Sequence, residues 1–291
     1  MQISVLLPAR DASATLPEAL AGMLAQRDAP PFEVICRSDH RVRVVRGEGR
    51  GLVAALNLGL SHCAGGLIAR MDADDVVHPD RLRLQVEMLM RDPTLGAAGS
   101  LVECIPRPLS PGLARLERWL NETVTAEQCR NGRFVEAPLV HPSATFRREA
   151  LDGGWEDHGW AEDWDLLLRL VEAGWQLAKV PQVLLDWRDS DARLTRTGAA
   201  YREEQMFRLR AHYLARGPLR GRAFDIWGAG PTGKRLAREL EAHGLRPRSF
   251  FDVAGDALML CAVGAAGARE EICALLEARK YREGEHFLFA A

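Results

Sequence analysis

The chain has 291 residues, of which 47% are hydrophobic and 27% are charged, the balance of a globular protein with a sizeable core. Its 38 basic and 40 acidic residues give a net charge of −2, so the total charge offers no reason to expect a nucleic acid or an anionic membrane as partner. No apolar run reaches the ~18 residues of a spanning helix, no signal-peptide pattern opens the sequence, and the six cysteines include no C-x-x-C pair. We therefore expect a cytoplasmic protein of about two domains, without a transmembrane segment, zinc site or disulfide framework.

Strand-like and helix-like segments alternate over the first 91 residues. Aliphatic runs at 3–8, 32–35, 42–45 and 67–71 predict strands, and apolar residues at helical spacing predict helices at 13–24, 51–62 and 81–91. Such alternation predicts a parallel sheet with helices on both faces.

Two joins between expected strands are short. Only six residues separate 32–35 from 42–45, and only four separate 250–253 from 258–263. Because neighbouring parallel strands need a crossover of about a dozen residues, each pair is either a hairpin or lacks its crossover segment. We favour the absence of the crossover, since both joins interrupt a regular α/β pattern.

The remainder of the chain divides at a glycine- and proline-containing segment. Residues 93–160 look irregular apart from a helix at 113–121 and a strand at 143–147, and further elements are expected at 164–173, 176–180, 183–187 and 201–215. A strand–glycine turn–helix–strand pattern begins after residue 221. We therefore predict domains at 1–215 and 222–291, joined by a linker at 216–221.

Three carboxylates follow the strand at 67–71, in Asp72-Ala73-Asp74-Asp75. They repel one another unless a cation offsets them, and Mg²⁺ or Mn²⁺ takes such oxygen ligands together with substrate phosphates. Ligands of open α/β sheets bind at the carboxyl ends of strands, where this cluster lies. The alternative is a solvated acidic turn that caps the following helix.

The motifs around this cluster resemble those of the family-2 nucleotide-sugar glycosyltransferases of the GT-A fold. The resemblance rests on Pro8-Ala9-Arg10 after the first strand, on the Gly-x-x-x-Ala-x-Asn-x-Gly helix of residues 51–59, on the Asp-x-Asp-Asp element, and on Glu162-Asp163-Trp164-Asp165-Leu166. It covers residues 1 to about 215. It implies a GT-A-type, mostly parallel sheet flanked by helices, to which a small Rossmann-like α/β domain is added.

The resemblance also implies roles for individual residues. Asp74 would bind Mn²⁺ or Mg²⁺, and Asp72 would face the ribose or nucleotide of a nucleoside-diphosphate sugar. The metal would neutralise the leaving nucleoside diphosphate. The other residues expected to contact the donor are Pro8, Ala9, Arg10, Asn57 and Arg188.

The second acidic motif is expected to face the acceptor. In a transfer with inversion, a general base removes the proton of the attacking hydroxyl, and the resemblance gives this role to Asp163. The residues expected to bind or orient the acceptor are Glu162, Asp165, His141 and Trp164. Alternatively, the carboxylates only offset a helix dipole, the tryptophans are ordinary packing, and the histidine is structural.

The sequence departs from the family pattern at two places. Ser190 stands where a histidine often follows the motif arginine, here Arg188, which leaves the protein ligands of the metal open. Cys36-Arg37-Ser38-Asp39 replaces the paired acidic residues that read the nucleotide base, so that role is given to no residue.

A second glycine motif lies near residue 228. Gly228, Gly230 and Gly233 fit G-x-G-x-x-G between a strand and a helix, and Asp252 stands where a ribose-binding acid is expected. These residues form a candidate second nucleotide site. The alternative is that the glycines only allow close packing of helix and strand.

Together these patterns predict an inverting, metal-dependent glycosyltransferase of the hexosyltransferase type. Its donor would be a nucleoside-diphosphate sugar, and its acceptor a hydroxyl of a saccharide, a lipid-linked sugar or a small molecule. The alternatives are a catalytically silent sugar-nucleotide-binding or scaffold protein and an NAD(P)-dependent oxidoreductase.

Overall fold

The computed structural model describes residues 2–35, 43, 45–47, 51–191, 193–251, 258–263 and 267–290. They form two compact units, each of which is described by itself. The first comprises Met1–Cys129, Pro138–His158 and Arg169–Arg193, and the second comprises Arg130–Ala137, Gly159–Leu168 and Leu194–Ala291.

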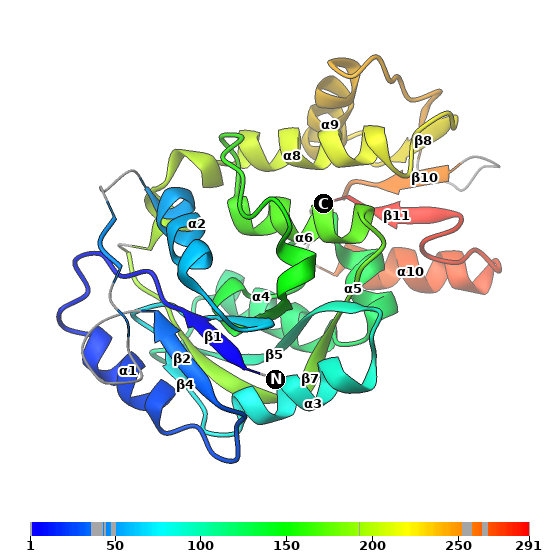
Figure 1. Ribbon diagram of the computed structural model, residues 1–291. Helices are drawn as coiled ribbons and strands as arrows, with labels where there is room; N and C mark the ends of the chain where they lie inside the picture. Colours follow the sequence, from blue (N-terminus) through cyan, green and yellow to red (C-terminus); the bar gives the residue numbers. More distant parts are fainter. Residues whose placement is uncertain are drawn as a thin grey trace. The chain divides into compact units, whose positions relative to one another are not determined.

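A seven-stranded sheet, counted over the described residues, forms the centre of the first unit (Figure 1). Its order is β2-β1-β3-β6-β5-β7-β4. The strands are β1 (Ile3–Leu6), β2 (Phe32–Ile35), β3 (Leu67–Arg70), β4 (Val76–Val77), β5 (Leu95–Ile105), β6 (Thr145–Arg147) and β7 (Gln176–Arg188).

The sheet is mixed. Strand β1 pairs parallel to β2 and β3, and β5 pairs parallel to β7. The short β6 lies antiparallel between β3 and β5, and β4 lies antiparallel to β7 at the edge. The predicted α/β architecture is therefore confirmed, while antiparallel pairings enter with the strands β4 and β6.

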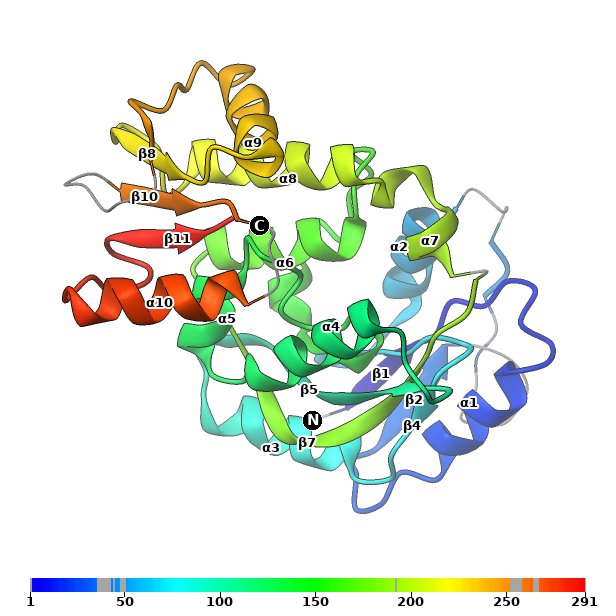
Figure 2. The same ribbon diagram turned by 180° about the vertical axis from the view of Figure 1, so that it is seen from behind.

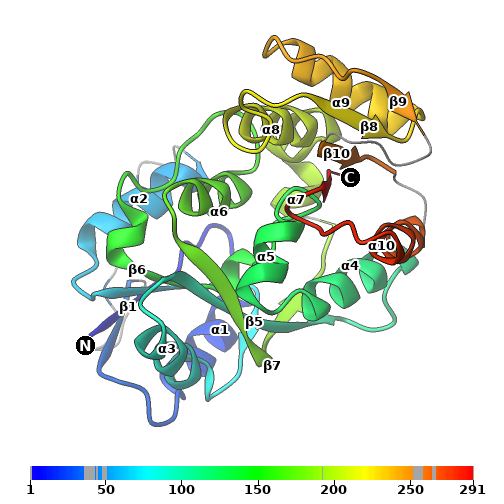
Figure 3. The same cartoon turned by 90° about the vertical axis from the view of Figure 1, so that its right-hand side faces the viewer.

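Helices cover both faces of this sheet, with α1 and α3 on one side and α2 and α4 on the other (Figure 3). The helices of this unit are α1 (Leu16–Leu24), α2 (Leu52–His62), α3 (Arg81–Arg91) and α4 (Pro111–Glu122); α5 (Ala126–Gly132) and α6 (Glu162–Glu172) cross the division between the units. Along the described chain, no helix is long and apolar enough to cross a membrane.

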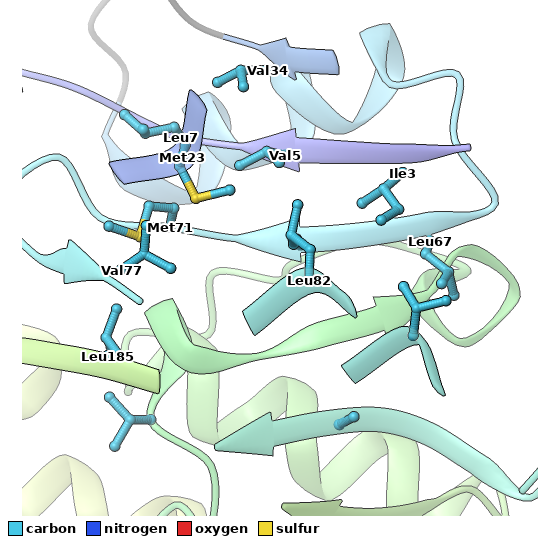
Figure 4. Close-up of a cluster of buried hydrophobic side chains, with 14 of the residues drawn as sticks. Ile3, Val5, Leu7, Met23, Val34, Leu67, Met71, Val77, Leu82 and Leu185 are labelled. Carbon is cyan, nitrogen blue, oxygen red and sulfur yellow. The ribbon is translucent and has the colours of Figure 1, made fainter. Parts of the chain in front are cut away.

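The core of the first unit packs the strands β1 and β3 against the helix α3. Ile3 and Val5 of β1, Leu67 of β3 and Met71, which follows β3, lie in one buried cluster with Leu82 of α3 (Figure 4). All of these side chains are at most 2% exposed, and every residue of β1 and β3 is buried, so both faces of the sheet are covered at these strands.

Strand β5 was not predicted from the sequence. Its segment Leu95–Ile105 contains Gly96 and Gly99, which weaken a strand pattern. Both glycines have a packing reason, because a Cβ at Gly96 would lie 2.7 Å from that of Trp175, and a Cβ at Gly99 would lie 2.8 Å from Leu139. Close approach of neighbouring side chains therefore takes the place of β propensity.

The two short joins have different outcomes. Arg43 and Val45 are not in a strand, so a second strand at 42–45 is wrong for these described residues. The later strands, β9 (Phe250–Phe251) and β10 (Leu258–Cys261), both pair parallel to β8 (Phe224–Trp227), which excludes a hairpin between them. Residues 252–257, which connect them, lie outside the described residues.

The second unit is built on an all-parallel sheet of order β11-β10-β8-β9, which contains four of the described strands. Figure 2 labels the strands β8, β10 and β11 of this sheet. Its remaining elements are α7 (Leu194–Thr197), α8 (Glu203–Arg216), α9 (Pro231–Glu241), α10 (Ala268–Ala278) and β11 (Phe287–Phe289). The core combines Phe224 and Ile226 of β8 with Leu236 of α9 and Phe207 of α8.

The compact units divide the chain differently from the predicted domain boundaries. Helix α8 contributes Phe207 and Leu214 to the core of the second unit, and the predicted linker at 216–221 therefore lies inside that unit. The boundaries at 215 and 222 stay a prediction about separately folding pieces.

Replacement of Gly65 by alanine tests the close approach of β1 to the turn before β3. A Cβ at Gly65 would lie 2.5 Å from the Ser4 nitrogen and 2.7 Å from the Ile3 carbonyl carbon, and these backbone atoms cannot rotate away. We expect Gly65→Ala to lower the free energy of unfolding by about 1–3 kcal/mol in urea titrations. Gly112→Ala is the control, because open space surrounds that helical position and alanine there should be neutral or stabilising. Equal stabilities of the two variants would contradict the packing argument.

Candidate functional site

The carboxyl ends of β1 and β3 lie side by side in the first unit. Leu6 pairs with Arg70, so the segments that follow both strands leave the same edge of the sheet. Pro8 is half-buried there, and Ala9 and Arg10 are exposed. The structure thus brings the Pro8-Ala9-Arg10 segment and the Asp72–Asp75 segment to one edge of the sheet.

The three carboxylates form one cluster. One oxygen from each of Asp72, Asp74 and Asp75 lies within 4.8 Å of the others. Asp72 and Asp74 are half-buried, whereas Asp75 is 2% exposed. Arg70 donates a hydrogen bond of 2.7 Å to Oδ1 of Asp72. This arrangement is more enclosed than a solvated acidic turn.

Burial raises the pKa of two of these acids. The pKa of Asp75 lies well above its usual value because of burial first, and then because of the negative charge of Asp72. The pKa of Asp74 is raised by the same two causes, in the same order. Within the described part of the chain, the buried Oδ2 of Asp75 has no hydrogen-bond partner. Clustered carboxylate oxygens with an unpartnered lone pair fit a hard divalent cation such as Mg²⁺ or Mn²⁺.

Arg188 holds the acidic turn from the end of β7. Its backbone nitrogen donates to Oδ1 of Asp75 at 2.8 Å, and its Nε donates to the carbonyl oxygen of Asp74 at 2.7 Å. Its Nη2 lies 2.9 Å from the Glu18 carboxylate of α1. The predicted contact with a diphosphate stays a proposal, and the structure adds a role in fixing the acidic turn.

Asn57 binds a backbone segment instead of pointing to open space. Its side-chain amide donates to the Trp155 carbonyl oxygen at 2.8 Å, and its Oδ1 accepts from the Trp155 nitrogen at 2.9 Å. Gly154 has φ +66°, and a Cβ there would lie 2.4 Å from that Oδ1. By these two hydrogen bonds, Asn57 therefore holds the Gly154–Trp155 segment against α2.

His141 lies in the core of the first unit and is 8% exposed. Burial lowers its pKa well below the usual value, and the positive charge of Arg70 lowers it further. Trp155 donates its indole N–H to Nε2 at 3.0 Å, which assigns the proton of the neutral ring to Nδ1. These contacts favour the structural alternative for His141.

The first turn of α6 carries the second acidic motif, in the second unit. Glu162 is 5% exposed and accepts a hydrogen bond of 2.6 Å from the Tyr201 hydroxyl. Asp165 is fully buried and accepts from Trp160 at 2.8 Å and from Tyr213 at 2.7 Å. Asp163 is half-buried, and its Oδ1 accepts the backbone N–H of Trp164. Of the three described acids, Asp163 is the one whose side chain keeps contact with solvent.

The tryptophans around this motif are mostly core residues. Trp164 is 1% exposed, donates to the Arg133 carbonyl oxygen at 2.7 Å, and lies under the guanidinium of Arg210. Trp155, in the first unit, is 2% exposed. The packing alternative is therefore favoured for both, and the predicted acceptor contact of Trp164 has no exposed ring face to support it.

Known proteins resemble part of the chain, and the region matched by a family model includes the Asp72–Asp75 cluster. Residues 36–155 match the family model for glycosyl transferase family 2. The amylovoran biosynthesis glycosyltransferase AmsE of Erwinia amylovora is 30% identical over 181 residues, which are 60% of this chain and 66% of that protein. The chain thus spans a little under two thirds of that relative's length.

Solved structures extend the likeness to the fold. S. aureus TarS in complex with UDP-GlcNAc matches with a TM-score of 0.58 at 15% identity, over 84% of this chain and 72% of TarS. The mannosyltransferase PcManGT from Pyrobaculum calidifontis, in complex with GDP-Man and Mn²⁺, matches with a TM-score of 0.50 at 18% identity, over 96% and 81%.

These comparisons support a family-2 assignment for residues 36–155, and the chain has the GT-A fold. The family resemblance inferred from the sequence is thereby confirmed. Within the chain, the Asp-x-Asp-Asp cluster belongs to the first unit and the α6 acids to the second, and each set is a feature of its own unit.

Sequence reasoning missed the buried cations beside the acidic cluster. Arg70 and Arg81 are at most 1% exposed, and Arg81 donates to the carbonyl oxygens of Arg70 and Ala144. The available signal was an arginine within the otherwise apolar run of residues 67–71. A charge in a buried strand needs a partner, and the nearest acids follow it directly.

The glycine turn after β8 has packing reasons at two of its three glycines. A Cβ at Gly228 would lie 2.8 Å from the Ala262 carbonyl oxygen, and a Cβ at Gly233 would lie 2.0 Å from the Gly228 oxygen. Gly230 faces open space. Asp252, predicted to bind a ribose, lies outside the described residues.

Neutralisation of Asp75 tests for electrostatic strain, by which its buried negative charge lowers the free energy of unfolding. A carboxyl group with a raised pKa holds its proton in the folded protein after the unfolded chain has lost it. Its contribution to stability therefore falls as the pH rises above the ordinary pKa of about 4. We expect Asp75→Asn to raise the free energy of unfolding at pH 7 by roughly 0.5–2 kcal/mol without added metal, and to flatten its pH dependence.

Asp80→Asn is the matched control for this measurement. Contacts with Arg83 and Arg27 lower the pKa of Asp80, so its neutralisation should reduce stability at pH 7. A loss of stability in Asp75→Asn similar to that of the control would contradict the strain argument.

Proposed function

We propose that this protein transfers a sugar from a nucleoside-diphosphate sugar to a hydroxyl group, with inversion and with a divalent metal ion. The observation that carries the proposal is the enclosed Asp72–Asp74–Asp75 cluster at the carboxyl edge of β3. A site with this much negative charge is suited to a metal ion that is shared with a diphosphate.

Each residue of the cluster would have its own role in donor binding. Asp74 would hold Mn²⁺ or Mg²⁺ with the unpartnered Oδ2 of Asp75 beside it, and Asp72 would face the nucleoside. When bound, the ion neutralises the charge of the departing nucleoside diphosphate. Arg188 would hold the acidic turn in place and add positive charge toward the phosphates.

Asp163 would act as the general base. A base must reach the proton of the acceptor hydroxyl. Among the described carboxylates of the first turn of α6, Glu162 and Asp165 are buried and Asp163 is half-buried. Glu162 and Asp165, which are bound to tyrosine hydroxyls, would orient this turn.

The donor and the acceptor are proposed as classes. TarS binds UDP-GlcNAc and PcManGT binds GDP-Man, which supports a hexose donor with a UDP or GDP carrier. The acceptor would be a hydroxyl of a saccharide, a lipid-linked sugar or a small molecule.

A second nucleotide site in the second unit remains part of the proposal. Gly230 directly precedes α9 as its N-cap and faces open space, which would leave room for a phosphate near the helix N-terminus. A thermal-shift titration with NAD(H) and NADP(H), without divalent metal, checks this site separately from the acidic cluster.

The metal requirement is tested by donor-dependent stabilisation. A ligand at 100 times its Kd raises the free energy of unfolding by about 2.7 kcal/mol, which differential scanning fluorimetry resolves. We expect UDP, GDP, a UDP-hexose or a GDP-hexose to raise the Tm only when Mn²⁺ or Mg²⁺ is present. We expect Asp74→Asn to abolish this shift. Asp80→Asn should keep it. A full shift in Asp74→Asn would refute the assignment of the metal ligand.

The base is tested by separating binding from turnover. With the donor identified by its Tm shift, we expect Asp163→Asn to lower kcat by about 10²–10⁴-fold, because the acceptor proton loses its base. The donor Kd should stay within about twofold of that of the unaltered protein. Unchanged turnover would exclude Asp163 as base, and binding without turnover in the unaltered protein, over a broad acceptor panel, would indicate a silent binding protein.

A further inference from the structure

Behind the acidic cluster lies a cation that is hidden from solvent. Arg70 is the last residue of β3, and its side chain is 2% exposed. Its Nη2 donates to Oδ1 of Asp72 at 2.7 Å, and its Nη1 donates to the Met71 carbonyl oxygen. In the described chain the buried Nε of Arg70 has no hydrogen-bond partner. The carboxylate of Asp72 is the counter-charge that this guanidinium bonds directly.

A second buried arginine fixes the backbone that carries Arg70. Arg81, the first residue of α3, donates to the Arg70 carbonyl oxygen at 2.6 Å and to Gln85 at 3.1 Å. Gln85 in turn donates to the carbonyl oxygens of Ala98 and Ser143. Arg70 therefore has little freedom to move, because helix α3 and strand β5 hold its strand end in place.

Geometry of this kind fixes one oxygen of Asp72. A charge-assisted bond from an immobile guanidinium sets the orientation of the carboxylate and leaves the other oxygen for a ligand. The positive charge also offsets part of the repulsion among the three acids before a metal ion arrives.

We propose that Arg70 is a positioning residue that aims Asp72 at the donor nucleotide and acts through that carboxylate. The inference rests on the proposed function, since it concerns the same site. Removal of such outer support around a metal site costs about 10–100-fold in affinity in other proteins. The complex of Mn²⁺ with a nucleoside diphosphate is anionic, so loss of the positive charge and loss of alignment weaken its binding together.

The test compares variants by direct binding, without an activity assay. The Kd of Mn²⁺–UDP and Mn²⁺–GDP is measured by calorimetry, and the Tm is recorded for each variant. We expect Arg70→Met to weaken binding at least about tenfold and Arg70→Lys, which keeps a charge near Asp72, to recover most of the loss. Binding by Arg70→Met within twofold of the unaltered protein would overturn the proposal.

Arg147→Met is the matched control. Arg147 is a part-buried arginine of β6 that donates to the carbonyl oxygens of Leu89 and Leu95, and it lies opposite Leu67, at the far end of β3 from Arg70. Its removal should lower the Tm and leave the Kd within twofold. An equal loss of affinity in Arg147→Met would reduce the effect of Arg70 to general destabilisation and overturn the proposal.

A double-mutant cycle with Asp72→Asn covers the case in which Arg70→Met does not fold. The double variant removes both charges of the pair, so the buried position of Arg70 carries no uncompensated charge. If Arg70 acts through Asp72, the double variant binds as Asp72→Asn does. A further loss of affinity in the double variant would show that Arg70 does not act through Asp72. No binding by the unaltered protein would instead refute the proposed function itself.

Discussion

Mutual repulsion among three carboxylates is the constraint around which the first unit is arranged. Asp72, Asp74 and Asp75 lie within four residues that follow a buried strand, and an arginine holds each of them by a hydrogen bond. Arg70 donates to the carboxylate of Asp72. The main-chain nitrogen of Arg188 donates to the carboxylate of Asp75, and its guanidinium donates to the carbonyl oxygen of Asp74. The antiparallel pairing of β4 with β7 brings Arg188 to this place, so the mixed sheet topology is a requirement of the site. Charge balance thereby links a local sequence motif to the order of the strands.

The sequence predicted most elements whose residues follow a simple apolar period. Strands β1–β3 and helices α2 and α3 lie within one or two residues of their predicted bounds, because one face of each is consistently apolar. Strand β5 was missed because its glycines permit close packing that only the folded chain shows. The two strands predicted at 176–180 and 183–187 are one strand, β7, in which a register shift at Ser100 and Leu101 of β5 accommodates Pro181.

The motifs were predicted better than the contacts of their residues. Spacing along the chain found the acidic cluster, because those three residues are neighbours in sequence. It could not find that Asn57 binds the backbone of Trp155, or that His141 accepts the indole N–H of the same residue, because these partners are brought together only by folding. Several motif residues therefore contact other parts of the protein and hold the site in position. Such residues hold loops and strands in position and leave the half-buried acids to meet a ligand.

The strand order of the second unit has a consequence for where that unit can evolve. Strand β8 lies between β9 and β10, so the chain departs to one side of it first and to the other side afterwards. Its carboxyl end is therefore a topological switch point, the place where doubly wound sheets open a crevice between helices. The glycine turn of Gly228 and Gly230 stands there. A new specificity of this unit would arise by changes in a handful of residues at that turn, while the rest of the small sheet stays a fixed scaffold.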